Sequence, residues 1–368
     1  MNITPYSCRL RPSAQHHGLP PRYGWGVRIA RLAVATCLLA SAACAAHGAV
    51  GTIAEFSGGL TANSGPFGIT AGPDGSMWFT QVGDDVSAVA RITMKGQITE
   101  FRTGIDPNAR PWEIATGPDG NLWFTELEMM RIARITHQGV VTEFSNGITP
   151  FKSAPSGITA GPDGAMWFTE LGNSAIGRIT MDGAVTEFTK GITQGSGPFD
   201  IASGPNGTLW FTGAWNGEKD VPGKSIGRST TLGAITEFQQ GIPAASKPAG
   251  IALGPDRTMW FTMNSADAIG RITPAGKVTV YRKGITKGSK PGLIALGYDG
   301  NMWFTETDGN RIGRITPKGV VTEFSKGITK GAGPIGIAAG PDGNMWFTEL
   351  GGNRIGRIIT GARPPQHR

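Results

Sequence analysis

The tripeptide Trp-Phe-Thr recurs along this chain at nearly constant spacing, and this repeat constrains the fold more than any other feature. The copies begin at Trp78, Trp123, Trp167, Trp210, Trp260, Trp303 and Trp346. Successive copies are 45, 44, 43, 50, 43 and 43 residues apart. Repeats with a period of about 20–50 residues are typical of propellers, solenoids and other arrays. The sequence therefore predicts seven copies of one structural unit.

Each repeat is a series of short apolar runs separated by turn residues. Residues 155–188, for example, contain Pro-Ser-Gly-Ile, Gly-Pro-Asp-Gly, Trp-Phe-Thr-Glu, Ile-Gly-Arg-Ile and Thr-Glu-Phe in that order. Runs of this length bounded by Gly, Pro, Asn and Asp indicate strands joined by tight turns, and no helical periodicity is present. Four antiparallel strands per repeat predict an all-β, seven-bladed β-propeller.

The two ends of the repeated region indicate how the ring closes. The last repeat stops at Ile355-Gly-Arg-Ile358 without a Thr-Glu-Phe strand, whereas Ile53-Ala-Glu-Phe56 precedes the first repeat as an unpaired strand. We expect residues 53–56 to supply the missing outer strand of the seventh blade, because this pairing protects an exposed edge. The predicted organisation is a leader at residues 1–48, one propeller at residues 49–361 and a tail at residues 362–368.

The leader has the pattern of a secretory signal peptide. Arg28 and Arg31 precede an apolar stretch from Leu32 to Ala43, and small residues follow around Cys44. The stretch is too short for a transmembrane helix, and no later segment has an apolar run of spanning length. We expect an exported, periplasmic or extracellular monomer. Ser41 stands where lipoprotein signals usually have leucine, which argues against lipidation.

Charge and residue counts exclude several classes of function. The formal net charge is +7, but residues 1–48 contain five arginines and no acidic residue, so the remainder carries only +2. The nearly neutral remainder of the chain lacks the positively charged surface that nucleic-acid binding requires. All three cysteines lie in the leader, at Cys8, Cys37 and Cys44, and His137 is the one histidine within the repeats. We expect no disulfide, no metal site built from thiolates or several histidines, and no histidine-based triad in the propeller.

The motifs Gly-Pro-Asp-Gly, Trp-Phe-Thr-Glu, Ile-Gly-Arg-Ile and Thr-Glu-Phe, repeated in this order over residues 51–360, resemble those of the virginiamycin B lyase family. The resemblance implies a seven-bladed propeller. It also implies a magnesium-assisted elimination that opens the ester bond of a streptogramin, a cyclic depsipeptide. In the family, histidines in Pro-His-x-Ile segments of the last two blades carry the chemistry, with glutamates nearby.

The family's catalytic constellation does not carry over onto this sequence. Gly292 and Ile335 stand where the two histidines are expected, and Gly333 stands where a glutamate precedes the proline. A further glutamate corresponds to Glu349 or Leu350, depending on the alignment. Well-placed acid–base groups contribute roughly 10²–10⁴-fold to a rate. We therefore expect a binding propeller that lacks the family's elimination chemistry.

Candidate ligand-binding residues are those that differ from repeat to repeat. They gather in the loops that lead into each blade, and the fourth repeat has a longer loop, residues 213–225, on the same face. Aromatic surface with a few charges suits a small molecule or a peptide. The predicted ligand-binding residues are Phe67, Arg110, Trp112, Glu113, Phe199, Asp200, Trp215, Lys247 and Lys290.

Two enzymatic alternatives remain open. One is an active C–O lyase on streptogramin-type cyclic depsipeptides, with Mg²⁺ as its cofactor. The other is a metal-dependent hydrolase that uses Glu113, Asp200 and a divalent cation in the channel.

Residues shared by most repeats are assigned to the scaffold. We expect the arginine that recurs in every repeat to pair with glutamates such as Glu100, Glu143 and Glu187, between strands or between blades. The copies of this arginine are Arg91, Arg134, Arg178, Arg228, Arg271, Arg314 and Arg357. The glutamates that end Trp-Phe-Thr-Glu are also assigned to the scaffold: Glu126, Glu170, Glu306 and Glu349.

Overall fold

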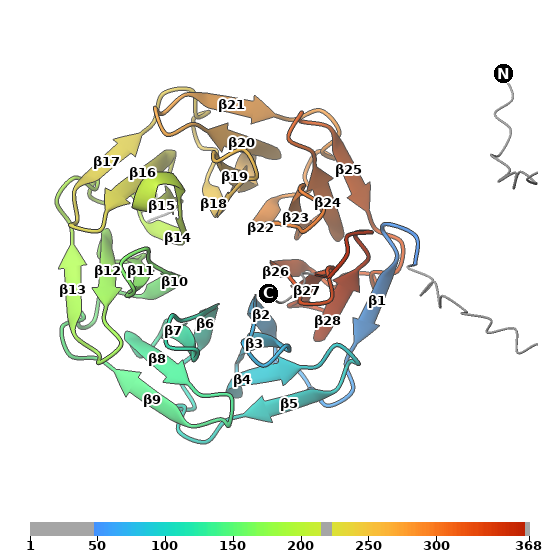
Figure 1. Cartoon of the computed structure of the whole chain (residues 1–368), viewed down its shortest axis with the longest axis horizontal. Helices are drawn as coiled ribbons and strands as arrows, with labels where there is room; N and C mark the ends of the chain where they lie inside the picture. The colour runs from blue at the N-terminus through green and yellow to red at the C-terminus, as the bar shows by residue number, and fades with distance from the viewer. Residues whose placement is uncertain (1–47, 215–222, 365–368) are drawn as a thin grey trace, which may run out of the picture. The chain divides into compact units, whose positions relative to one another are not determined.

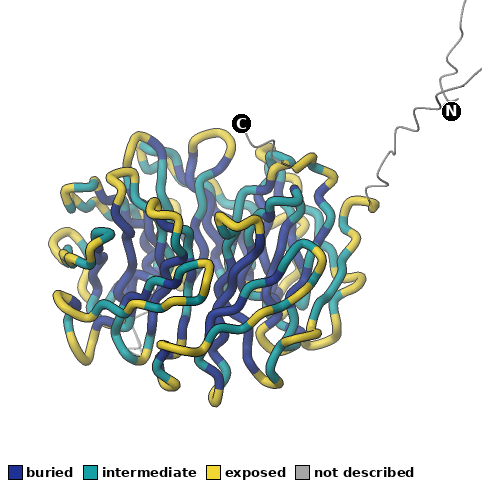
Figure 2. Tube along the Cα trace, turned by 60° about the horizontal axis from the view of Figure 1, so that its bottom comes forward, coloured by how far each residue is buried: buried dark blue, intermediate teal, exposed yellow. Residues whose placement is uncertain are grey.

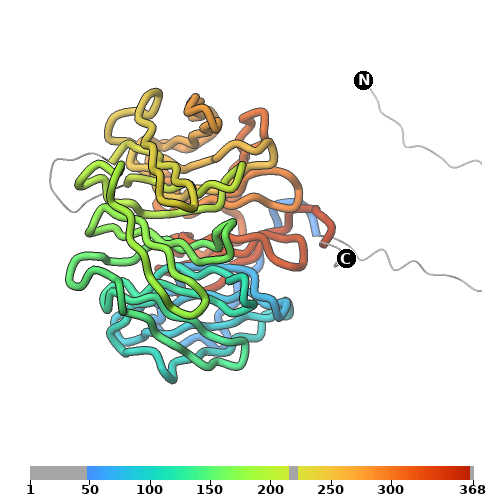
Figure 3. Tube along the Cα trace, turned by 60° about the vertical axis from the view of Figure 1, so that its left-hand side comes forward, coloured from blue at the N-terminus to red at the C-terminus, as the bar shows by residue number. Residues whose placement is uncertain are grey.

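A computed structural model describes residues 48–214 and 223–364, which form a ring of seven four-stranded antiparallel sheets. Figure 1 shows the sheets around a central axis, with the first strand of each blade innermost. The predicted all-β, seven-bladed propeller is confirmed. In Figure 3, blades that follow one another in the chain also follow one another around the ring, so that the first and last parts of the propeller meet.

The first four blades have regular strand order from the channel outwards. Blade 1 contains β2 (Pro66–Ala71), β3 (Met77–Gly83), β4 (Val86–Ile92) and β5 (Ile98–Phe101). Blade 2 contains β6 (Pro111–Thr116), β7 (Leu122–Glu126), β8 (Arg131–Ile135) and β9 (Val141–Phe144). Blade 3 contains β10 (Pro155–Ala160), β11 (Met166–Glu170), β12 (Ala175–Ile179) and β13 (Val185–Phe188). Blade 4 contains β14 (Pro198–Ser203), β15 (Thr208–Gly213), β16 (Ser225–Thr230) and β17 (Ile235–Phe238).

The last three blades follow the same plan, except that blade 7 takes its outer strand from the start of the propeller. Blade 5 contains β18 (Pro248–Leu253), β19 (Met259–Met263), β20 (Ala268–Ile272) and β21 (Val278–Tyr281). Blade 6 contains β22 (Pro291–Leu296), β23 (Met302–Glu306), β24 (Arg311–Ile315) and β25 (Val321–Phe324). Blade 7 contains β26 (Pro334–Ala339), β27 (Met345–Glu349), β28 (Arg354–Ile358) and β1 (Ile53–Phe56).

The ring is closed by antiparallel pairing of β1 with β28. Ile53 lies opposite Ile358, and Phe56 lies opposite Ile355. Figure 1 shows blue β1 beside red β28 at the outer edge of the seventh blade. This arrangement confirms the predicted closure, and it covers the edge that β28 would otherwise expose.

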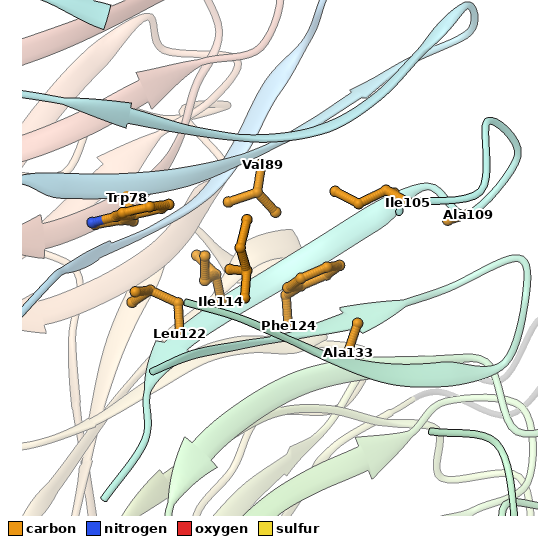
Figure 4. Close-up of a cluster of buried hydrophobic side chains, with 9 residues drawn as sticks. Trp78, Val89, Ile105, Ala109, Ile114, Leu122, Phe124 and Ala133 are labelled. Carbon is orange, nitrogen blue, oxygen red and sulfur yellow. The ribbon is translucent and has the colours of Figure 1, made fainter. Parts of the chain in front are cut away.

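The core lies between neighbouring blades, and Figure 2 shows the buried strands between loops that are exposed on both faces. In Figure 4, Trp78 and Val89 of blade 1 pack against Ile114, Leu122 and Phe124 of blade 2. All seven tryptophans of the Trp-Phe-Thr segments are fully buried. Burying side chains of this size contributes a large part of the stability of a fold that has no disulfide among the described residues.

Each of these tryptophans anchors a layered cluster within its own blade. In blade 2, Trp123 Nε1 donates to Asp119 Oδ1 at 3.0 Å, and the Trp123 ring stacks on Phe144 with centroids 5.3 Å apart. Arg134 lies over the Trp123 ring at 5.4 Å and pairs with Asp119 at 3.5 Å. The expected pairing of the recurring arginine with a glutamate is therefore wrong for Arg134, whose acidic partner is the turn aspartate. Glu143 pairs instead with Arg131, at 2.6 Å.

The threonine of Trp-Phe-Thr links each blade to the next. Thr169 Oγ1 accepts a hydrogen bond from Gly157 N at 2.8 Å and donates one to Phe199 O of blade 4 at 2.8 Å. The equivalent bond from Thr348 to Phe67 O joins blade 7 to blade 1. The innermost strands are thus held in register around the whole ring.

Helical structure in the described ranges is limited to two short 3₁₀ turns, Pro205–Gly207 and Asn264–Ala266. No helix in that part of the chain is long and apolar enough to cross a membrane.

Candidate functional site

One face of the ring carries both the loops leading into the blades and the loops between second and third strands. Leu127 N donates to Arg110 O at 3.3 Å, and Ala214 N donates to Gly197 O at 3.1 Å, which places the two kinds of loop side by side. The turns between first and second strands lie on the opposite face because the strands are antiparallel. We call the first face the mouth face.

The residue before each leading proline adopts a left-handed backbone in all seven blades: Gly65 (φ 59°), Arg110 (53°), Ala154 (44°), Gly197 (53°), Lys247 (48°), Lys290 (50°) and Gly333 (58°). This conformation is uncommon for residues other than glycine and costs roughly 1–2 kcal/mol for an ordinary side chain. The long cations Arg110, Lys247 and Lys290 are thus held in a strained backbone at the mouth face. Because the same conformation recurs in every blade, it belongs to the scaffold, and only the side chains at this position differ.

The residue after each leading proline forms what we call the mouth ring: Phe67, Trp112, Ser156, Phe199, Ala249, Gly292 and Ile335. The carbonyl of each accepts the threonine hydroxyl of the preceding blade. The backbone of the ring is therefore the same in every blade, while its side chains differ. A ring of this kind can present an asymmetric surface on a symmetric scaffold.

A pocket of about 200 Å³ opens among these side chains. It draws residues from blades 1, 4, 5, 6 and 7, and it is lined by Phe67, Phe199, Ala214, Lys247, Ala249, Asn264, Gly292, Leu293 and Ile335. Most of its wall is apolar. Asn264 is held in place because its Nδ2 donates to Pro291 O at 3.2 Å. Lys247 supplies the positive charge in this lining.

An aromatic stack borders the pocket on the side of blades 1 and 2. The Phe67 and Trp112 rings have centroids 3.9 Å apart at an angle of 35°. Arg110 lies 5.7 Å from the Trp112 ring and pairs with Glu128 at 3.2 Å. Phe67 therefore belongs both to the pocket wall and to the stack, which connects Trp112 and Arg110 to the pocket.

Two carboxyl groups lie one residue further along the innermost strands. Asp200 Oδ1 accepts Ile201 N and its Oδ2 accepts Ile251 N, both at 2.8 Å. Glu113 Oε1 is buried and has no hydrogen-bond partner. Burial raises the pKa of Asp200 to about 7. Burial, followed by the charge of Asp200, raises the pKa of Glu113 well above its ordinary value.

Seven of the nine predicted site residues fall into three groups. Phe67, Phe199 and Lys247 line the pocket, whereas Arg110 and Trp112 form the stack beside it. Glu113 and Asp200 lie deeper in the channel. Lys290 does not line the pocket and instead pairs with Asp308 at 2.6 Å, while Trp215 lies outside the described residues. Their role in ligand binding stays a prediction.

The predicted set leaves out six of the nine lining residues: Ala214, Ala249, Asn264, Gly292, Leu293 and Ile335. Leu293 follows the mouth ring directly, at the position that Glu113 and Asp200 occupy in their own blades, and comparison of these positions would have found it. Asn264 stands in the loop after β19, and nothing in the sequence marks it as different from other loop residues.

The glutamates that end Trp-Phe-Thr-Glu are buried inside the blades and do not line the pocket: Glu126, Glu170, Glu306 and Glu349. Burial raises the pKa of each to about 8, and a neighbouring outer-strand glutamate contributes in every case. In blade 1, Gln81 takes this position and its Nε2 donates to Glu100 at 2.7 Å. These residues belong to the scaffold.

The residues at the family's chemical positions do not suit a magnesium site. Gly292, Gly333 and Ile335 supply no side-chain oxygen or nitrogen, and a Cβ at Gly292 would lie only 2.7 Å from Thr305 Oγ1. Within residues 48–214 and 223–364, no group of three or more His, Cys, Asp or Glu side chains is placed to hold a metal ion. Magnesium requires an octahedral shell of oxygen ligands, of which one or two carboxylates are usually protein-derived.

Comparison with family models and with solved structures points to one protein family. The sequence profile of the virginiamycin B lyase family matches residues 44–219 and 215–363. Virginiamycin B lyase from Staphylococcus aureus has a solved structure that is 36% identical, covers 84% of this chain and 99% of that chain, and gives a TM-score of 0.75. A search of curated proteins finds no match.

Two further solved structures have similar scores. A catalytically inactive histidine-to-alanine variant of the Staphylococcus aureus lyase, with quinupristin, is 36% identical, covers 84% of this chain and 99% of that chain, and has a TM-score of 0.74. A streptogramin B lyase is 34% identical, covers 83% of this chain and 97% of that chain, and has a TM-score of 0.74.

Proposed function

We propose a function on the premise that this chain belongs to the virginiamycin B lyase family. In this proposal the chain is an exported propeller that binds a small apolar ligand or a peptide at its mouth face, without the family's elimination chemistry. The observation that carries the proposal is the pocket of about 200 Å³ in which side chains from five blades meet. Concave, largely apolar sites with a few placed polar groups are the usual form of small-molecule sites.

The composition of the pocket supports binding. Phe67, Phe199 and Ile335 supply apolar surface, and Lys247 and Asn264 supply polar groups that can orient a ligand. The stacked Trp112 extends the apolar surface beyond the pocket. An asymmetric ligand needs a surface of this kind, because identical residues in all blades would offer it seven equivalent orientations.

The same pocket supports the loss of elimination chemistry. Gly292 and Ile335, at the expected histidine positions, both line it and offer no group for proton transfer. The one histidine in the described residues, His137, follows β8 in a turn on the face opposite the mouth. In the Staphylococcus aureus enzyme, a histidine-to-alanine variant is catalytically inactive. The residues at these positions do not fit magnesium, which therefore has no part in the proposed binding function.

Elimination by a different set of residues is the second candidate. It is favoured by the 36% identity to a virginiamycin B lyase over 99% of that enzyme. In that case the acid–base groups would come from Glu113 and Asp200, which lie beside the mouth ring and have raised pKa values. A metal-dependent hydrolase built on the same two carboxyl groups has less support, since they have no third ligand among the described side chains.

Export is proposed from the sequence of the leader alone. The basic residues Arg28 and Arg31, the apolar stretch and the small residues around Cys44 lie in a part of the chain outside the described residues. Expression with the intact leader, followed by fractionation and sequencing of the mature N-terminus, tests this part of the proposal.

The deciding experiment combines turnover and binding. The purified chain is incubated with a streptogramin B with and without Mg²⁺, and the Staphylococcus aureus lyase serves as the positive control. We expect no ring opening above background by mass spectrometry. Titration calorimetry with the same compound is expected to show saturable binding that Phe199→Ala weakens and His137→Ala leaves unchanged. Magnesium-dependent ring opening by the native chain would overturn the binding proposal in favour of the lyase.

A further inference from the structure

Three of the seven blades carry a basic side chain immediately before the leading proline: Arg110 in blade 2, Lys247 in blade 5 and Lys290 in blade 6. In each of the three, the backbone oxygen of this residue accepts a hydrogen bond from the N–H of the residue that follows the second strand, at 3.3, 3.1 and 3.3 Å respectively. The three cations therefore start from the same backbone frame. Differences between them come from the side chains around them.

In blades 2 and 6 the cation has an acidic partner from its own blade. Arg110 pairs with Glu128 at 3.2 Å, and Lys290 pairs with Asp308 at 2.6 Å. Each acid is the second residue after the end of the second strand, which is β7 in blade 2 and β23 in blade 6. The loop after the second strand thus supplies the counterion in both blades.

Blade 5 has no acid at this position, where the second residue after β19 is Ser265. Ser265 N donates to Ser246 O at 3.0 Å. In blade 2, Glu128 N makes the equivalent bond to Ala109 O at 3.4 Å, so the serine is placed as the acid is but carries no charge. The ion pairs formed within residues 48–214 and 223–364 do not include Lys247. Blade 5 therefore lacks the counterion that the other two blades supply.

Two acids near blade 5 are engaged by backbone groups. Asp267 Oδ1 accepts Lys290 N at 3.0 Å, and its Oδ2 accepts Gly288 N at 2.7 Å, so this side chain holds the connector that leads into blade 6. Both oxygens of Asp200 also accept backbone N–H groups, at 2.8 Å each. Neither acid lines the mouth pocket, and of the described residues that do, Lys247 is the one with a charge.

Lys247 shares its edge of the pocket with a hydrogen-bond donor. Asn264 N donates to Lys247 O at 3.1 Å, so the two residues are neighbours. The Asn264 amide Nδ2 donates one hydrogen to Pro291 O at 3.2 Å, and an amide nitrogen carries a second hydrogen that a ligand can accept. Lys247 is exposed, and a lysine at a pocket wall can add its methylene stem to the apolar surface while its ammonium group reaches water. The pocket thus combines an apolar interior with a positive rim.

We infer that the mouth pocket takes an organic anion, with an alkyl or aryl group against Phe199, Leu293 and Ile335 and a carboxylate at the rim beside Lys247 and Asn264. This inference rests on the proposed binding function and names the chemical class of its ligand. A carboxylate at the rim keeps its contact with water, so binding does not require full desolvation of the charge. Pairing with an exposed lysine then adds a modest favourable contribution.

Other ligand classes fit the lining less well. An organic cation would meet Lys247, and a metal ion would find no carboxylate, histidine or cysteine among the lining residues. Calcium and magnesium take about six or more oxygen ligands, and most of this wall is apolar. An uncharged apolar compound would use the interior alone and would gain nothing from the lysine. The charge of the ligand is therefore the property to test.

The test compares two probes of the same shape, 3-phenylpropanoate, which is ionised at neutral pH, and the uncharged 3-phenylpropanamide. Titration calorimetry on the full chain is expected to show about fivefold tighter binding of the carboxylate than of the amide at low ionic strength. This preference should shrink at high ionic strength, because salt screens an exposed ion pair.

Three substitutions assign the preference to the rim. Lys247→Met removes the charge, keeps an apolar stem of similar length, and should reduce the affinity for the carboxylate to that for the amide. Ser265→Asp supplies the acid that blades 2 and 6 have at this position, and it should lower the affinity for the carboxylate in the same direction. Ser265→Asn is its uncharged control and should leave the preference in place. Lys318→Met, in the turn between β24 and β25 on the opposite face, controls for the loss of one positive charge.

Melting curves establish that the variants are folded. Equal affinity for the two probes, or no binding of either, would overturn the assignment of an organic anion. A carboxylate preference that persists in Lys247→Met, or that grows in Ser265→Asp, would overturn it as well. Phe199-dependent binding of a streptogramin B, without any preference for the carboxylate probe, would leave the proposed function intact and reject this inference alone.

Discussion

Residue identity repeats from blade to blade in the interior of the blades but varies at the mouth ring, although both are built from adjacent residues of the same repeats. Inside the blades, the stack of tryptophan on an outer-strand aromatic residue recurs in all seven sheets. At the mouth ring, a side chain can be phenylalanine, tryptophan, serine, alanine, glycine or isoleucine. Every blade packs against its neighbours in the same way, so the packing residues repeat. Binding an asymmetric ligand in one orientation requires blades that differ. Repetition therefore marks scaffold, and its absence marks the candidate site.

Small departures inside the blades support this distinction, because they replace a contact and keep the packing. In blade 4 the usual turn aspartate is Asn206, and Trp210 Nε1 donates to Thr208 Oγ1 at 2.9 Å instead. In blade 5 the outer aromatic residue is Tyr281, which still stacks on Trp260 with centroids 5.5 Å apart. Mouth-ring differences, in contrast, change size and chemistry together.

The largest effect is expected from removing the strand that closes the ring. Deletion of residues 49–58 removes β1 and leaves β28 as an exposed apolar edge, which can pair with other chains. We expect a lower melting temperature and concentration-dependent aggregation, measured by calorimetry and light scattering. A melting curve identical to that of the intact propeller would show that β1 does not stabilise the ring.

Truncation of a repeated tryptophan comes next. Trp303→Ala leaves a cavity between blades 6 and 7 and removes the hydrogen bond that Trp303 Nε1 donates to Asp299 Oδ1 at 3.0 Å. We expect a loss of about 3–5 kcal/mol in the free energy of unfolding, measured with urea. Trp112→Ala, a tryptophan of the mouth ring, is the matched comparison. Equal losses in the free energy of unfolding for Trp303→Ala and Trp112→Ala would contradict the distinction between scaffold and site.

The third prediction concerns the buried glutamates inside four blades. Their pKa of about 8 lies above the ordinary value of 4.5, so the folded protein binds these protons more tightly than the unfolded chain does. Their contribution to stability is fully present below pH 4.5 and is lost as the pH rises through about 8. The propeller should therefore lose stability in mildly alkaline solution.

Glu126→Gln tests this mechanism, because Gln81 shows in blade 1 that an amide can donate to the outer glutamate at 2.7 Å. We expect the variant to be more stable than the native chain at pH 9 by about 1–3 kcal/mol, the cost of a buried unpaired polar group. The exposed Glu128→Gln is the control and should leave the pH profile unchanged. A native stability that rises from pH 6 to pH 9 would contradict the assigned protonation.

Substitutions at the mouth should have the smallest effect on stability and a clear effect on binding. Trp112→Ala, or Lys247→Ala combined with Lys290→Ala, should weaken ligand binding by about 1–3 kcal/mol through lost stacking or lost charge pairing. Melting temperatures should change little. Of the two lysines we expect Lys247 to dominate, since Lys290 is engaged by Asp308. Crystallographic mapping of a ligand to the opposite face would discard these site residues.

Most of the fold could be predicted from the sequence, because every blade repeats the same turn and strand signals. The spacing of Trp-Phe-Thr predicted the blade count, and the unpaired strand at residues 53–56 predicted the closure. It did not predict the acidic partner of Arg134, because strand order does not determine which of two nearby acids a long side chain reaches. The structure places that arginine beside Asp119 and leaves Glu143 to Arg131.

The candidate site was less predictable than the fold. Phe67, Phe199 and Lys247 were found because they break the repeat, and they do line the pocket. Lys290 breaks the repeat too, but its interaction with Asp308 depends on the conformation of two loops, which composition does not determine. Asn264 contributes through a hydrogen bond to a backbone carbonyl, and such bonds leave no trace in the sequence.

Pairing of β1 with β28 also has a consequence for biosynthesis. Ile53 pairs with Ile358, so the first strand of the propeller to be synthesised cannot pair until the last strand has been synthesised. While the chain is still on the ribosome, or still passing through a membrane if it is exported, its first strand has no partner and the circle cannot be complete. Contacts of such long sequence separation form late and slowly. A polypeptide that ends prematurely, even a few residues before Arg354, would therefore remain an open arc with an unpaired strand at each end, and quality control could recognise it by those strands.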